Sequence, residues 1–140
     1  MKENSIVSLA DSNYFELLNE LIDSIQKFDQ SKSIAICILD AGLTEEQKKI
    51  LSAKVDEIKN AEWDIEVPGF KVRGKEWLKS QVSRAFLPNY FPNYKKYLWI
   101  DCDAWVQEWS SIELYFKACE DGKLGITQTM APGYRIMSKV

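Results

Sequence analysis

The amino-acid sequence predicts an α/β protein with a mainly parallel, twisted sheet covered by helices on both faces. Short and almost continuously apolar segments alternate with segments whose apolar residues recur at helical spacing. Strands that are apolar throughout are typical of parallel sheets, because helices bury both faces of such a sheet. The chain has 140 residues, of which 46% are hydrophobic and 28% charged. This length and balance suit a single domain over residues 1–140.

The first half of the chain contains two clear strand–helix units. SIVSLA (5–10) and SIAICILD (33–40) are rich in β-branched residues, and we expect both to be strands. The apolar residues after the first run have helical spacing: Tyr14, Leu18, Leu21, Ile22, Ile25 and Phe28. After the second run, Thr44 and Gln47 are spaced as a capping box. We therefore expect a second helix there, with these residues inward: Ile50, Leu51, Val55 and Ile58.

The second half is less regular but continues the alternation. AEWDIEV (61–67) alternates between apolar and polar residues and predicts a third strand, followed by a glycine- and proline-containing loop. A helix is expected from about residue 76 to 86 with Trp77 inward, ended by the prolines that follow it. The remaining expected elements are a fourth strand at 97–100, a helix at 110–119 and a fifth strand that begins in 123–128.

Composition excludes several classes of function. The net charge of -3, from 18 basic and 21 acidic residues, gives no general attraction for nucleic acid or an anionic membrane. The chain has no histidine, which excludes imidazole catalysis and histidine–metal sites. Its three cysteines are widely spaced and form neither a disulfide framework nor a zinc pattern. With no signal peptide or transmembrane run, we expect a cytoplasmic protein, either free or held at the inner face of a membrane.

Two aspartates, Asp101 and Asp103, interrupt the apolar stretch YLWIDCDAWV (97–106). Burying two neighbouring carboxylates is unfavourable, since each loses hydration and each disfavours the charge of the other. In an extended chain, residues two apart point to the same side, so the pair can present its oxygens together. Carboxylate oxygens are hard ligands that suit Mg²⁺ or Mn²⁺, and such an ion can hold a diphosphate. The alternative is that the aspartates accept backbone hydrogen bonds in a loop.

A second polar cluster follows the first expected strand. Ligands of parallel sheets bind at the carboxyl ends of the strands, where both clusters fall. Asp11 and Asn13 can hydrogen-bond a base or ribose, and Tyr14 can stack on a base. The alternative is a helix cap formed by Asn13 with Glu16, with Tyr14 in the core. Arg84 can hold phosphate or sugar oxygens with its guanidinium, or form an ordinary surface ion pair.

Together these clusters resemble glycosyltransferase family 8, the glycogenin-like and bacterial lipopolysaccharide-galactosyltransferase-like enzymes of the GT-A fold. The resemblance extends over roughly residues 5–108 and rests on three segments in order: IVSLADSNYFELLNELIDSI, ILDAGLTEEQKKIL and SRAFLPNYFPNYKKYLWIDCDAWV. It implies a Rossmann-like GT-A nucleotide-binding half, without the C-terminal half that binds the acceptor in this family. It also implies a retaining transfer from a UDP-sugar to a saccharide, a lipid-linked acceptor or a protein.

The resemblance assigns a role to each candidate residue. Asp11, Asn13 and Tyr14 would hold the uracil and ribose of the UDP-sugar. Arg84 would contact the donor sugar region and the acidic motif. Asp101 and Asp103 would bind Mn²⁺ or Mg²⁺ on the diphosphate, with Asp101 also near the ribose or sugar. The family's usual histidine ligand has no counterpart in this chain.

Two other readings remain open at this point. A nucleotide-sugar-binding module that lacks the catalytic half would keep the donor site without turnover. A haloacid-dehalogenase-like phosphatase also carries D-x-D after an apolar strand, with the first aspartate as the nucleophile. That family expects the motif on the first strand and a threonine or valine where Trp105 stands, so the sequence favours the transferase.

Overall fold

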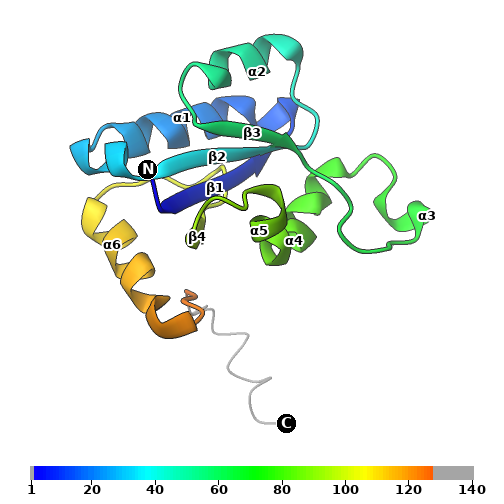
Figure 1. Ribbon diagram of the computed structural model, residues 1–140. Coiled ribbons are helices and arrows are strands. Elements are labelled where there is room, and N and C mark those ends of the chain that lie inside the picture. Colours follow the sequence, from blue (N-terminus) through cyan, green and yellow to red (C-terminus); the bar gives the residue numbers. More distant parts are fainter. Residues whose placement is uncertain (1, 128–140) are drawn as a thin grey trace, which may run out of the picture.

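A four-stranded sheet in the order β3-β2-β1-β4 forms the centre of the fold. The structure is a computed structural model that describes residues 2–127 (Figure 1). Every neighbouring pair of strands is parallel, as predicted. The strands are β1 (Asn4–Ala10), β2 (Ala35–Asp40), β3 (Glu57–Asn60) and β4 (Lys96–Trp99).

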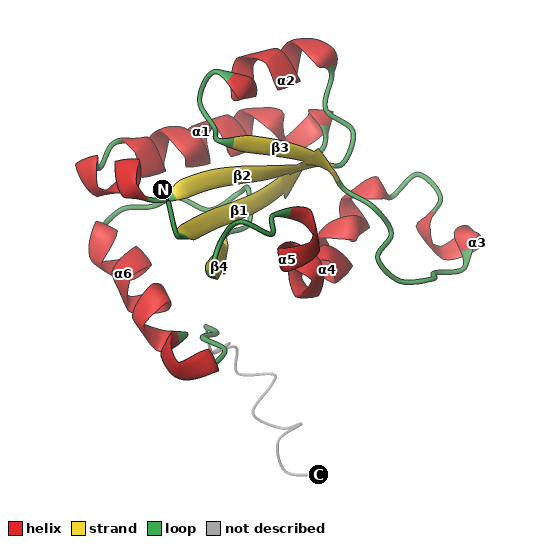
Figure 2. Ribbon diagram, viewed as in Figure 1, coloured by secondary structure: helices red, strands yellow, loops and turns green. Residues whose placement is uncertain are grey.

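Helices cover both faces of this sheet (Figure 2). The α-helices are α1 (Phe15–Gln26), α2 (Glu45–Ser52), α3 (Gly69–Val72), α4 (Lys79–Ser83), α5 (Leu87–Tyr90) and α6 (Trp109–Ala118). Short 3-10 helices lie at Ser12–Tyr14, Asp29–Ser33, Glu76–Leu78, Arg84–Phe86 and Glu120–Gly122. None of the helices within residues 2–127 has the length and apolar character needed to cross a membrane.

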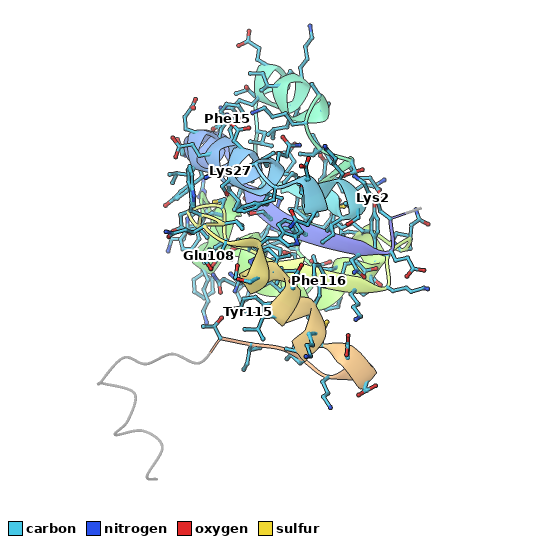
Figure 3. All side chains as sticks on the ribbon, turned by 90° about the vertical axis from the view of Figure 1, so that its left-hand side faces the viewer. Lys2, Phe15, Lys27, Glu108, Tyr115 and Phe116 are labelled. Carbon is cyan, nitrogen blue, oxygen red and sulfur yellow. The ribbon has the colours of Figure 1, made fainter. Side chains whose placement is uncertain are left out.

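Two apolar clusters hold the helices to the sheet. On one face, β1 and β2 pack against α1, α2 and α6, with Leu18, Leu51 and Ile112 fully buried. Figure 3 labels two further members of this layer, Phe15 at the start of α1 and Phe116 on α6. On the other face, the same strands pack against α5 and the residue that follows it. The central strands are therefore buried on both sides, which explains their continuous apolar sequence.

The order of the strands brings the ends of β1 and β4 together. The chain steps from β1 to β2 to β3 in one direction and then returns to place β4 on the other side of β1. Beyond the last paired residues, the Ile100 amide still donates to the Val7 carbonyl at 3.0 Å. In α/β sheets, ligands bind at the carboxyl ends of strands where the strand order reverses in this way. The polar segments after β1 and β4 lie at this reversal point.

Most of the predicted elements are confirmed. The strands that begin near residues 5, 33 and 97 and the helix in 110–119 are present. The Thr44–Gln47 capping box is formed in both directions, with the Gln47 amide donating to Thr44 Oγ1 at 3.2 Å. The helical region expected from 76 to 86 exists, but it consists of α4 flanked by 3-10 helices and continues through Pro88 into α5.

The predicted third strand is wrong. The strand is Glu57–Asn60, and residues 61–67 form no helix or strand. Ile58, expected on the buried face of the second helix, lies in β3 opposite Ile38 of β2. The second helix ends at Ser52, earlier than its apolar pattern indicated. Ile58 lies beyond this end, and a single apolar residue there fits the spacing of a helix or of a strand. Pairing with β2 selects residues 57–60 as the strand, and a local sequence pattern does not show this pairing.

Four smaller expectations also fail. Ile50, expected inward on the second helix, is 48% exposed. Trp77 is 46% exposed and not inward, and it lies in the short 3-10 helix Glu76–Leu78 and not in one continuous helix. Tyr14 is 45% exposed, and Phe15 takes the buried position at the start of α1. Residues 123–127 contain no strand, and residue 128 lies outside the described residues.

Candidate functional site

A pocket of about 170 Å³ opens where β1 and β4 end side by side. Its lining includes most of the site residues predicted from the sequence: Asp11, Tyr14, Arg84, Asp101 and Asp103. Asn13 does not line it and is exposed beside it. The remaining lining residues are Leu9, Ala10, Trp77, Ser80, Gln81, Trp99 and Cys102. The topology thus brings together residues that lie up to 94 positions apart in the sequence, Leu9 and Asp103.

A larger hollow of about 660 Å³ lies at the opposite ends of the strands. It is bordered by Asn4 at the start of β1, Lys96 at the start of β4 and residues of α6. None of the predicted site residues lines it. Ligands of parallel sheets bind at the carboxyl ends of the strands. We therefore take the smaller pocket as the candidate functional site.

Asp11 shapes the first wall of the pocket. Its Oδ1 accepts hydrogen bonds from the amides of Asn13 at 2.9 Å and Tyr14 at 3.2 Å. Asp11, and not Asn13, is therefore the cap of the helical segment that leads into α1. This cap holds the turn that leaves the Tyr14 ring at the pocket. The interpretation of Tyr14 as a core residue is wrong, since the ring is nearly half exposed.

The loop after β2 supports the Asp11 turn from behind. The Gly42 carbonyl accepts the Ser12 amide at 3.0 Å, and the φ of Gly42 is +130°, a backbone region that favours glycine. Asp40 fixes this loop, because its Oδ1 accepts the amides of Gly42 and Leu43, both at 2.7 Å. The buried Asp40 carboxylate, which also pairs with Lys48 at 3.3 Å, thus has a structural explanation.

Asp101 and Arg84 form the second wall. Arg84 Nη2 donates to Asp101 Oδ1 at 2.8 Å, and Arg84 Nε donates to the Ser80 carbonyl at 3.0 Å. Arg84 therefore forms an ion pair with the acidic motif, and its contact with phosphate or sugar oxygens stays a prediction. The pair is partly exposed at the pocket rim, where such interactions contribute little to stability. The Arg84 guanidinium places a positive charge at the pocket, beside the acidic motif.

The acidic motif does not continue the strand. β4 ends at Trp99, and the Ala104 amide donates to the Asp101 carbonyl at 3.0 Å, which closes a turn over residues 101–104. The expectation that both aspartates project from extended chain is therefore wrong. They reach the same pocket because this turn bends the chain at the end of the sheet.

Cys102 lies between the two aspartates and also lines the pocket. Burial first, and then the nearby carboxylates of Asp103 and Asp101, raise the pKa of its thiol to about 11. The thiol is therefore protonated at neutral pH, and a thiolate is the form that acts as a nucleophile or metal ligand. This leaves the chemistry of the segment to its carboxylates.

The carboxylates fit a hard divalent ion. Asp101 Oδ1 is occupied by protein donors, whereas its Oδ2 and the exposed Asp103 carboxylate have no hydrogen bond or ion pair within the described residues. Oxygen ligands of this kind suit Mg²⁺ or Mn²⁺, which commonly keep several positions for water and phosphate. Within residues 2–127, no group of three or more acidic, cysteine or histidine side chains could hold a metal ion. A ligand such as a diphosphate would therefore have to complete the coordination.

Sequence reasoning missed several pocket residues: Trp77, Ser80, Gln81, Trp99 and Cys102. Trp99 has an apolar neighbourhood in the sequence and resembles a core residue, although its indole carries a donor two positions before Asp101. Ser80 and Gln81 lie on the same helical segment as Arg84, at spacings of four and three residues. A residue three or four positions from a predicted ligand on a helix shares its face, and this signal was available.

The sheet order and the pocket at its reversal define a Rossmann-like α/β fold. A family model described as glycosyl transferase family 8 matches residues 5–123, and the chain belongs to this family. A search of curated proteins found no match.

Solved structures of LgtC have the same fold. A structure of an active-site mutant of LgtC matches with a TM-score of 0.58 and 22% identity. The galactosyltransferase LgtC in complex with donor and acceptor sugar analogs matches with a TM-score of 0.57 and 21% identity. Each match covers 77% of this chain and 41% of the LgtC chain, so this chain spans about two fifths of the length of these proteins.

Proposed function

We propose that this chain is the donor-binding part of a glycosyltransferase, and that its pocket binds a UDP-sugar with Mn²⁺ or Mg²⁺. One observation carries the proposal: an acidic pair, an arginine and an exposed tyrosine from distant segments line a single pocket at the reversal point of the sheet. Membership of family 8 supports the reaction class, and a relative of the same fold has been solved with donor and acceptor sugar analogs.

The first wall would bind the uridine. The Tyr14 ring is exposed at the pocket and can stack on uracil, as aromatic rings stack on bases elsewhere. Asp11 uses Oδ1 for its backbone cap, and no hydrogen bond to Oδ2 is formed within the described residues. This free oxygen can accept a ribose hydroxyl. Asn13, beside the pocket, can reach an edge of the base or ribose.

The second wall would bind the diphosphate and the sugar. Asp101 and Asp103 would hold the divalent ion, which supplies positive charge to the departing UDP when it is bound. Arg84 is the cation of this wall and lies against Asp101, so it can contact the donor sugar or a phosphate oxygen. The sugar would pass, with retention of configuration, to a saccharide, a lipid-linked acceptor or a protein.

Thermal unfolding with UDP tests this proposal. UDP should raise the melting temperature more with Mn²⁺ than with EDTA, because the ion would join the carboxylates to the diphosphate and strengthen binding. A ligand at 100 times its Kd adds about 2.7 kcal/mol of stability. Asp103→Asn should remove the difference between Mn²⁺ and EDTA, since an amide keeps the shape and loses the charge. Asp29→Asn, an exposed aspartate paired with Lys32 far from the pocket lining, is the matched control and should keep it. A metal-dependent shift that survives Asp103→Asn would rule out the assigned site.

A non-catalytic donor-binding module is the second candidate. It is favoured by one observation, the lack of a third candidate metal ligand close to the acidic pair within residues 2–127. The two candidates differ in turnover. Release of UDP from a UDP-sugar in the presence of Mn²⁺ selects the transferase, whereas metal-dependent UDP binding without release selects the module. The phosphatase reading is disfavoured, because the acidic motif follows β4 and Asp101 is already paired with a guanidinium.

A further inference from the structure

Trp99 connects the core of the sheet to the proposed metal-binding carboxylate. It is the last residue of β4 and lies opposite Val7 of β1. Its side chain is partly buried and packs against the apolar cluster on the α5 face of the sheet. The polar edge of the same indole reaches out of this cluster, and Nε1 donates to Asp101 Oδ1 at 2.7 Å. One rigid side chain therefore joins the core to the pocket.

The same ring also supports the cation of the site. The guanidinium carbon of Arg84 lies 4.9 Å from the centre of the Trp99 ring, within the range of a cation–π interaction. Arg84 Nη2 donates to the oxygen that Trp99 already contacts. Arg84 Nε is held by the Ser80 carbonyl, so the guanidinium is fixed on two sides. Trp99, Arg84 and Asp101 form a closed triangle of contacts.

This triangle determines which oxygen of Asp101 remains available. Both donors converge on Oδ1, and no protein donor within the described residues contacts Oδ2. Without the indole N–H, the carboxylate can rotate, and the planar guanidinium can then bind both oxygens in the bidentate manner that arginine favours. A carboxylate held on both oxygens by arginine is a poor metal ligand. Groups that hydrogen-bond to a ligating carboxylate in this way orient it for the metal.

We propose that Trp99 is a positioning residue, whose indole N–H holds Asp101 with Oδ2 toward the divalent ion and keeps Arg84 on Oδ1. This inference rests on the proposed function, because it concerns the same site. Trp99 need not touch the donor, since it acts through Asp101 and Arg84. A merely structural tryptophan would instead affect the stability of β4 and leave the metal dependence of UDP binding unchanged.

The test removes the hydrogen-bond donor of Trp99 and keeps an aromatic side chain. Trp99→Phe retains an aromatic side chain in the cluster and removes only the N–H donor and part of the ring. The affinity for UDP is measured by calorimetry with Mn²⁺ and with EDTA, and Mn²⁺ binding in the presence of UDP is followed by electron paramagnetic resonance. We expect the Mn²⁺ affinity to fall roughly 10- to 100-fold, the range for partners that orient metal ligands. UDP binding in EDTA should change little.

A control variant is available two residues earlier in the same strand. Tyr97 donates its hydroxyl to the carbonyls of Phe91 at 2.6 Å and Tyr94 at 2.8 Å, and it does not line the pocket. Tyr97→Phe therefore also removes an aromatic donor that packs on β4. It should lower stability and leave the Mn²⁺ affinity at the wild-type value. Equal Mn²⁺ affinities in Trp99→Phe and wild type would overturn the role of Trp99.

The wild-type protein provides the second measurement if Trp99→Phe does not fold. The indole N–H resonance that moves in Asp101→Asn identifies Trp99, and it should also move when Mg²⁺ and UDP are added together. An unchanged resonance, with UDP bound, would contradict the inference. Wild-type protein that shows no metal-dependent UDP binding at all refutes the proposed function instead, so the two failures can be told apart.

Discussion

The replacement Tyr14→Ala separates recognition of the base from recognition of the diphosphate. The ring is 45% exposed at the pocket, and the neighbouring cap uses only the Tyr14 backbone amide, which alanine keeps. The stability loss should therefore be modest, about 1 kcal/mol. If the ring stacks on uracil, UDP affinity should fall by about 1–3 kcal/mol, the range for stacking of bases on aromatic side chains. This corresponds to a Kd increase of about 5- to 150-fold.

Calorimetry with two ligands measures the effect. Inorganic pyrophosphate with Mn²⁺ has no base and should bind Tyr14→Ala as it binds the wild type. Tyr14→Phe keeps the ring and should retain UDP affinity. Leu17→Ala serves as a stability control, because it removes a side chain of α1 that is 41% exposed and outside the pocket lining. Equal losses for UDP and pyrophosphate in folded Tyr14→Ala would refute stacking on uracil.

The remaining predictions concern the stability of the protein and the pH dependence of that stability. The buried Val106 amide donates to Ser24 Oγ at 3.0 Å. Ser24→Ala removes this acceptor and should lower the free energy of unfolding by about 1–3 kcal/mol. An unchanged midpoint in urea unfolding would contradict this. Gly42→Ala should lower the free energy of unfolding by about 1–3 kcal/mol, because a φ of +130° strains any residue with a Cβ. Steric overlap would not contribute, since the added Cβ would lie 3.8 Å from Asp11 Cβ. An unchanged free energy of unfolding would contradict this strain. Burial, the largest cause, raises the pKa of Tyr90 from 10.0 to about 12, so its contribution to stability is present below pH 10.0 and is lost as the pH rises toward about 12. Tyr90→Phe should lack this part of the alkaline loss, and identical pH profiles would exclude it.

The sequence predicted the parts of the fold that depend on local signals. The continuous apolar runs of β1 and β2 and the Thr44–Gln47 capping box are local, and the structure confirms them. β3 was misplaced because the apolar residues of 55–67 fit more than one periodicity, and only pairing with β2 selects residues 57–60. Such pairing depends on contacts between distant segments, which no local pattern records.

In the candidate site too, the residues at strand ends were predicted, whereas contacts between distant segments were not. The polar segments after β1 and β4 were predicted from their position at strand ends, and the structure places both at one pocket. The contribution of Trp99 could not be predicted, because it depends on the turn after β4 and on an arginine from a separate helical segment. The exposure of Trp77 likewise follows from the break of one expected helix into several short ones.

A crystal structure with UDP and Mn²⁺, with anomalous scattering to locate the metal, tests the central claim most directly. The account predicts one Mn²⁺ that bridges Asp101 Oδ2 and the Asp103 carboxylate to the diphosphate, with uracil against the Tyr14 ring and Arg84 still on Asp101 Oδ1. A metal bound away from Asp101 and Asp103, or UDP bound outside the pocket between β1 and β4, would contradict it.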